Sequence, residues 1–92
     1  MLTAKRLTIS GRVQGVWYRA WCVKTARELA LTGWVRNRAD GSVETLVQGT
    51  QNAVEQFIAQ AWNGPPAANV RDIAAYTETI SDMRDFEQRA SE

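Results

Sequence analysis

The change of hydrophobic periodicity along the chain constrains its fold more than any other feature of the sequence. Apolar residues recur every three to four positions over residues 18–31 and 51–62, which predicts two amphipathic helices. Apolar and polar residues instead alternate over residues 5–13 and again over 33–49, as they do in half-buried strands. Asp40-Gly41 supplies turn chemistry in the middle of 33–49, so this stretch is predicted to be an antiparallel hairpin.

The C-terminal part of the chain completes this pattern. The stretch NGPP at 63–66 ends the second helix, because proline lacks an N–H donor and disfavours helix just before it. Residues 69–80 are predicted to be a fourth strand, and residues 85–90 a short fifth strand or a frayed tail. The order β-α-β-β-α-β indicates an α+β fold, a ferredoxin-like split β-α-β sandwich with two helices on one face of an antiparallel sheet. Without an internal repeat or linker, residues 1–92 are expected to form a single domain.

The same periodicities predict which side chains face the core. The first strand presents Leu7, Ile9 and Val13 on one face, and Trp34 is expected on the open face of the sheet. The helix faces expected to be buried are Tyr18, Cys22, Thr25, Ala26 and Leu29 in the first helix and Val54, Phe57, Ile58, Ala61 and Trp62 in the second.

Charge is distributed unevenly over the chain. Residues 1–40 hold eight Lys or Arg against two acidic residues, a balance of +6, whereas residues 41–92 hold three against eight, a balance of −5. This asymmetry suits a small anionic ligand held by the first half, although an unevenly charged solvated surface explains it as well. The sequence shows neither a signal peptide nor an apolar run long enough for a membrane span, and its one cysteine cannot form an internal disulfide. A cytoplasmic protein that does not contact the membrane is expected.

The stretch SGRVQGVWYRAW at 10–21 joins the first strand to the first helix. Such a corner presents consecutive backbone N–H groups and the partly positive start of a helix, and both favour anions. Gly15 is able to take the positive φ that an anion-binding loop requires, and Arg19 is placed to return its guanidinium to a phosphate or carboxylate. The alternative is an ordinary glycine turn followed by an arginine that faces solvent.

Other phosphate and metal sites do not fit this sequence. GRVQG matches neither the GxGxxG nor the GxxxxGK[ST] pattern. The chain has no histidine, and a single cysteine does not make a zinc site, so no metal and no cofactor are expected. Cys22 lies on the apolar face of a predicted helix and is interpreted as a core residue.

Two motifs resemble the signatures of the acylphosphatase family: GRVQGVWYR at 11–19 and GWVRNRADGSVETLVQG at 33–49. The likeness is close over residues 5–49 and looser beyond them. The family usually closes with a strand in which a Phe is followed by an aliphatic residue, whereas this chain has DFEQRASE, with Glu87 and Gln88 after Phe86. That departure puts the edge strand in doubt more than the chemistry.

The resemblance implies a hydrolase that cleaves acyl phosphates to a carboxylate and inorganic phosphate without a metal. The family's phosphate-binding arginine falls on Arg19, and its water-positioning asparagine falls on Asn37, on a strand expected to neighbour the first one. The phosphate-binding loop falls on the backbone N–H groups of Gln14, Gly15, Val16, Trp17 and Tyr18. The expected partner is thus a small acyl phosphate, and the enzyme is expected to be a monomer.

Two other functions are compatible with the same fold. One is a non-catalytic acylphosphatase-like module that serves as an interaction surface or as part of a larger carbamoyl-transfer enzyme. The other is a ferredoxin-like domain that binds single-stranded RNA on sheet aromatics. The second is disfavoured because LTGWVRNRADGSV lacks the required aromatic spacing and the net charge is only +1, so no nucleic-acid partner is expected.

Overall fold

A computed structural model describes residues 2–92, and its elements follow the predicted order. Of the two possibilities for residues 85–90, the short fifth strand is the one that forms. The strands and helices are β1 (Leu2–Arg12), α1 (Tyr18–Glu28), β2 (Thr32–Asn37), β3 (Val43–Thr50), α2 (Gln51–Ala61), β4 (Asn69–Thr77) and β5 (Phe86–Gln88). Within residues 2–92, no helix is long and apolar enough to cross a membrane.

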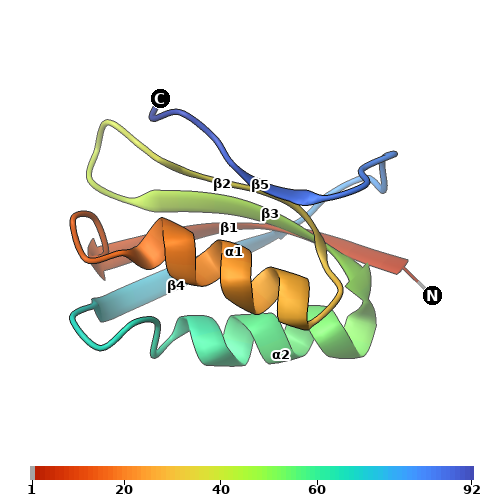
Figure 1. Ribbon diagram of the computed structural model, residues 1–92, viewed down its shortest axis with the longest axis horizontal. Coiled ribbons are helices and arrows are strands. Elements are labelled where there is room, and N and C mark those ends of the chain that lie inside the picture. Colours follow the sequence, from red (N-terminus) through yellow and green to blue (C-terminus); the bar gives the residue numbers. More distant parts are fainter. Residues whose placement is uncertain (1) are drawn as a thin grey trace.

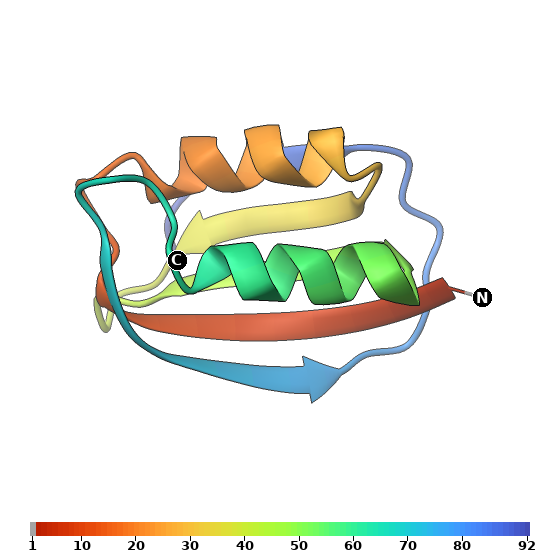
Figure 2. The ribbon, with the colours of Figure 1, turned by 90° about the horizontal axis from the view of Figure 1, so that it is seen from below.

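One five-stranded sheet carries both helices on the same face (Figure 1). Its strand order is β4-β1-β3-β2-β5, and every neighbouring pair is antiparallel except β2 and β5, which run parallel. Helix α1 packs against β2 and β5, while α2 packs against β3 and β1 (Figure 2). The predicted ferredoxin-like α+β class is therefore confirmed, with a mixed rather than a wholly antiparallel sheet.

The strand that carries Asn37 is not a neighbour of β1, and that expectation is wrong. The hairpin β2–β3 inserts β3 between them, with Arg36 paired to Glu44 and Glu44 in turn paired to Thr8. A split β-α-β unit leaves room for this central strand, and α1 crosses over it to reach β2. The start of α1 and the end of β2 consequently lie at the same end of the sheet.

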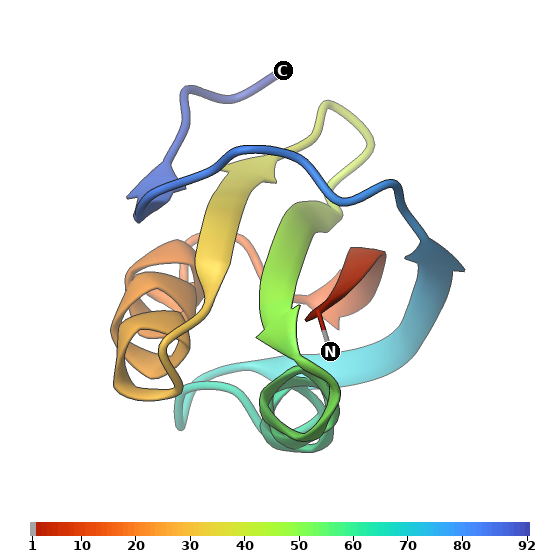
Figure 3. The ribbon, with the colours of Figure 1, turned by 90° about the vertical axis from the view of Figure 1, so that its right-hand side faces the viewer.

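The segment between β4 and β5 crosses the face of the sheet that lies away from the helices, here called the open face (Figure 3). Two hydrogen bonds hold it there: the Gln48 Nε2 donates to the Ser81 carbonyl at 2.8 Å, and the Ser81 N–H donates to the Gln48 Oε1 at 3.0 Å. This crossing brings β5 to the edge of β2.

The fifth strand is ordered in spite of its polar residues. Phe86 is fully buried, and its ring centroid lies 6.5 Å from that of Phe57. Beyond β5 the chain still follows β2, since the Arg89 N–H donates to the Val35 carbonyl at 2.8 Å. The buried Phe86 and the pairing with β2 thus stabilise this edge.

The core lies between the sheet and the two helices, largely as predicted. Leu7, Ile9 and Val13 are buried beneath the helix residues Tyr18, Cys22, Thr25, Ala26, Val54, Phe57 and Ala61. Leu29 and Ile58 are half-buried and pack against this core. Trp62 is 46% exposed: its backbone is still helical, so it lies above Ile58 at the edge of the buried face of α2 and not at its centre. Trp34 lies on the open face as expected, with the Arg36 and Arg89 guanidinium carbons 5.2 and 4.9 Å from the centre of its ring.

Candidate active site

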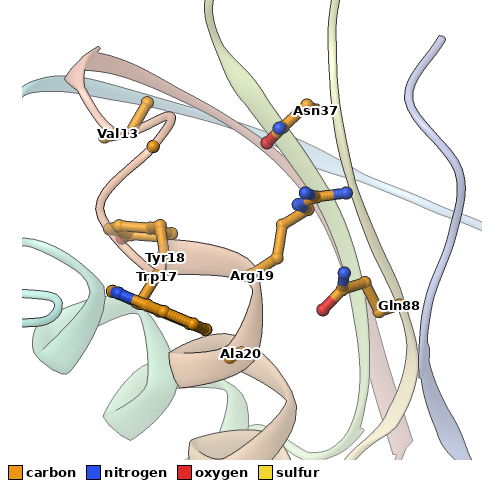
Figure 4. Close-up of a pocket in the computed structure, with 8 residues that line it drawn as sticks. Val13, Trp17, Tyr18, Arg19, Ala20, Asn37 and Gln88 are labelled. Carbon is orange, nitrogen blue, oxygen red and sulfur yellow. The ribbon is translucent and has the colours of Figure 1, made fainter.

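A cavity of about 350 Å³ opens where the loop after β1, the start of α1, the end of β2 and β5 meet. Figure 4 shows side chains from these elements facing the same space. The cavity is lined by Val13, Gly15, Trp17, Tyr18, Arg19, Ala20, Asn37 and Gln88.

The loop between β1 and α1 contains two residues with left-handed backbone conformation. Gly15 has φ 73°, as the sequence predicted, and a Cβ at this position would meet nothing within 4 Å. Trp17 has φ 67° and is the residue that precedes α1. A left-handed conformation costs a non-glycine residue roughly 1–2 kcal/mol, so neighbouring contacts must hold the loop in this shape.

The side chain of Gln14 provides such a contact. Its Nε2 donates to the carbonyl oxygens of Arg38 at 2.8 Å and of Ser42 at 2.9 Å, and both belong to the turn between β2 and β3. Asp40 stabilises that turn by accepting from the Ser42 hydroxyl at 2.6 Å and the Ser42 N–H at 2.9 Å, and these bonds lower the pKa of the Asp40 carboxyl. The loop and the strand that ends at Asn37 are therefore fixed to each other.

Tyr18 fixes the start of α1 against α2. Its ring is buried, and its hydroxyl donates to the Ala61 carbonyl at 2.5 Å. Burial raises the pKa of Tyr18, and likewise that of the Cys22 thiol one turn further along the helix. A buried neutral thiol is a poor nucleophile, so Cys22 is a core residue, as the sequence indicated.

Arg19 is the second residue of α1 and extends across the cavity. In Figure 4 its guanidinium lies between the side chains of Asn37 and Gln88. Within residues 2–92 it forms no ion pair, and the first turn of α1 contains no acidic residue. Because the first N–H groups of a helix also lack intrahelical partners, this end of the cavity favours an anion.

Asn37 is the last residue of β2 and lies opposite the loop. Side chains on a strand alternate between faces, so Asn37 shares the helix-facing side with Gly33 and Val35, and both of these are buried. Its side chain is directed into the cavity (Figure 4). The Asn37 carbonyl accepts from the Glu92 N–H at 2.9 Å, which extends the pairing begun by β5.

Five of the seven residues singled out in the sequence line this cavity: Gly15, Trp17, Tyr18, Arg19 and Asn37. Gln14 and Val16 do not, because Val16 packs into the core and Gln14 is turned toward the hairpin. Their contribution through backbone N–H groups stays a prediction. Sequence reasoning missed Gln88, although its spacing of two residues from the buried Phe86 places both on one face of β5.

The described residues, 2–92, contain no group of three or more His, Cys, Asp or Glu side chains that could hold a metal ion. The polar side chains that enter the cavity are instead those of one arginine, one asparagine and one glutamine. A guanidinium is suited to bind phosphate through two parallel N–H donors, and a carboxamide offers both a donor and an acceptor for water.

Fold and site together define a ferredoxin-like α+β protein with a cationic cavity at its first strand-to-helix corner. The family model described as Acylphosphatase matches residues 5–88 of this chain. An acylphosphatase from Rhodospirillum rubrum is 51% identical over 83 residues, which cover 90% of this chain and 91% of that protein. The chain belongs to the acylphosphatase family, and its relatives identify it as a hydrolase.

Solved structures agree with this assignment. The structure of an acylphosphatase from Coxiella burnetii matches with a TM-score of 0.93 at 38% identity, over 96% of this chain and 93% of that one. Full-length HypF in its phosphate- and nucleotide-bound form matches with a TM-score of 0.92 at 26% identity, over 99% of this chain but only 12% of that one. The fold therefore also occurs as a small part of a larger protein.

Proposed function

We propose that this protein hydrolyses acyl phosphates in the cavity at the β1–α1 corner, with Arg19 and Asn37 as its catalytic residues. Arg19 and the backbone N–H groups of residues 14–18 hold the phosphoryl group, and Asn37 positions the attacking water. The observation that carries this proposal is that Gly15 and Arg19 of the first motif and Asn37 of the second line one cavity.

The reaction requires little proton transfer from the protein. The water oxygen forms a bond to phosphorus while the bond from phosphorus to the acyl oxygen breaks, and the electron pair leaves on the carboxylate. A carboxylic acid has a pKa of about 4, so the carboxylate departs without a proton donor, and a chain without histidine is not handicapped. The proton of the water passes to a phosphoryl oxygen.

The protein therefore has to bind the phosphoryl group, neutralise its charge and align the attacking water with it. A phosphoryl group develops charge over its three equatorial oxygens, and the guanidinium of Arg19 and the start of α1 are placed to offset it. Asn37 is uncharged and does not titrate, so it is able to orient a water throughout the physiological pH range. Alignment of this kind accounts for much of the rate enhancement in phosphoryl transfer.

The proposal includes the setting in which the enzyme works. Residues 1–92 act as one domain and as a monomer in the cytoplasm, without metal, cofactor, membrane or nucleic-acid partner. The substrate is a small acyl phosphate, and the products are its carboxylate and inorganic phosphate.

Substitution of Arg19 by lysine tests the proposal. The wild-type protein is expected to hydrolyse benzoyl phosphate in the presence of a chelator, and Arg19→Lys to lose at least about 100-fold in kcat/KM, since a point charge does not replace the planar fork of donors. Arg84→Lys is the matched control, because the Arg84 side chain is 89% exposed and lies outside the cavity. The measurement is the initial rate of benzoyl phosphate loss.

Circular dichroism establishes that each variant is folded. A folded Arg19→Lys enzyme with wild-type turnover would contradict the role of Arg19. A folded wild-type protein that does not hydrolyse benzoyl phosphate would favour the alternative of a non-catalytic interaction module.

A further inference from the structure

A second cavity, of about 600 Å³, continues from the first along the outer side of α1. The two cavities share Ala20 and Gln88, which stand on opposite sides of their junction (Figure 4). A ligand whose phosphoryl group lies beside Arg19 would therefore have one extended space open to the rest of it. We call this second cavity the α1–β5 groove; it is lined by Ala20, Val23, Lys24, Arg27, Glu28 and Gln88.

The groove follows one face of the helix. Ala20, Lys24 and Arg27 are spaced i, i+4 and i+7, so they lie one above another along α1. With a rise of about 1.5 Å per residue, the backbone of Lys24 is about 6 Å further along the helix than that of Ala20. Lys24 therefore lies beyond Ala20 on the path that leads away from the first cavity.

The side chains change from apolar to charged with distance from the first cavity. Ala20 and Val23 lie nearest the junction, followed by the cation of Lys24, which is exposed and forms no ion pair within residues 2–92. One turn further, Arg27 already donates to the Phe86 carbonyl at 3.0 Å and lies 3.5 Å from an Asp85 carboxylate oxygen.

Glu28 places a negative charge at the far end of the groove. An anion at the level of Lys24 meets a cation, whereas an anion carried one turn further meets Glu28 and the occupied Arg27. A ligand carboxylate in the groove is therefore best neutralised at the level of Lys24.

We propose that the α1–β5 groove is the acyl-side binding site of this enzyme, and that Lys24 favours acyl phosphates whose acyl chain ends in a carboxylate. This inference rests on the proposed function. The phosphoryl group lies beside Arg19, the acyl chain passes between Ala20 and Gln88, and its terminal carboxylate pairs with the Lys24 ammonium.

The test compares two substrates that differ only at the far end of the acyl group. Adipoyl monophosphate carries a terminal carboxylate, and hexanoyl phosphate has the same number of carbons and no charge there. The wild-type enzyme is expected to favour adipoyl over hexanoyl phosphate in kcat/KM by about two- to fivefold, the range of an exposed ion pair. The preference should fade as salt is added.

Three variants separate Lys24 from general effects of charge. Lys24→Gln is expected to bring the ratio of the two kcat/KM values to about one, and Lys24→Glu to invert it. Lys5→Gln is the matched control and keeps the preference, because the Lys5 ammonium donates to Thr77 on β4, at the opposite edge of the sheet.

The outcomes distinguish a failure of the acyl-side site from a failure of the proposed function. Equal kcat/KM values for the two substrates in the wild type, or a preference that neither Lys24 substitution changes, would overturn the acyl-side site. The proposed function would still stand if the same protein hydrolyses acetyl phosphate. A wild-type protein that hydrolyses neither acetyl phosphate nor the longer substrates contradicts the proposed function itself.

Discussion

Arg19 and Asn37 are held in place in different ways. Arg19 belongs to a helix whose first residue, Tyr18, is buried and bonded to Ala61 on α2. Asn37 is the last residue of β2, which pairs with β3 on one side. On the other side the Asn37 carbonyl accepts a hydrogen bond from the Glu92 N–H. The guanidinium therefore depends on helix packing, and the carboxamide depends on strand pairing.

Cys22 gives a prediction at the residue scale. Its thiol is fully buried, and burial raises its pKa, so less thiolate is present in the native protein at pH 8 than in the unfolded chain. We expect Ellman's reagent to label native Cys22 at least about tenfold more slowly than the protein in guanidinium chloride. The measurement is the rate of absorbance change at pH 8.

A variant with an exposed thiol serves as the control. Cys22→Ala combined with Ala59→Cys places the only thiol on the exposed face of α2, where labelling should be fast with and without denaturant. Equal rates for native and unfolded wild type would show that Cys22 is accessible and would contradict its assignment to the core.

At the scale of the elements, three strands are joined on the open face by one carboxylate. The Glu44 side chain, on β3, is only 5% exposed, and its oxygens lie 3.4 Å from Arg6 on β1, 2.7 Å from Arg36 on β2 and 3.3 Å from Arg38 just beyond β2. Each arginine side chain is about one third exposed, so solvent screens part of this interaction. The cluster ties the end of β2 that carries Asn37 to the middle of the sheet.

Loss of this carboxylate should destabilise the fold. Glu44→Gln is expected to lower the free energy of unfolding by about 1–3 kcal/mol, because the three arginines lose the buried carboxylate between them and keep only the more exposed carboxylates of Glu78 and Glu92. The measurement is urea denaturation followed by circular dichroism at pH 7. Glu55→Gln, on the exposed face of α2, is the matched control, and an equal effect of the two substitutions would show that the cluster adds no stability.

At the scale of the whole molecule, local signals predicted more of the fold than long-range ones did. The periodicity of α1 and α2 and the turn at Asp40-Gly41 depend on nearby residues, and these elements form as expected. The parallel pairing of β5 with β2 depends on residues about fifty positions apart, which periodicity does not report. Helical spacing placed Trp62 on the buried face of α2, but it lies with Ile58 at the edge of that face and is half exposed, and spacing alone does not report how wide the buried face is.

In the candidate site, too, the residues within local motifs were predicted and those that depend on long-range contacts were not. Gly15, Arg19 and Asn37 lie within motifs that are recognisable in the sequence, and the structure brings them to one cavity. Gln88 reaches that cavity only through the pairing of β5. The Trp17 side chain is exposed, and its left-handed backbone is held by the contacts of Gln14 before it and Tyr18 after it. Neither feature has a local sequence signal strong enough to predict it.

In the proposed mechanism, Arg19 holds the phosphoryl group while Asn37 positions the attacking water. The measurement that tests it most directly is the effect of Asn37→Ala on kcat for benzoyl phosphate and, in the same preparation, on the inhibition constant of inorganic phosphate. Asn52→Ala, on the exposed start of α2, is the control.

If Asn37 positions water alone, kcat falls by at least about 100-fold, while the inhibition constant of phosphate changes by less than about threefold. A folded variant that keeps its turnover, or one that loses phosphate affinity in proportion to its turnover, would contradict this division of roles.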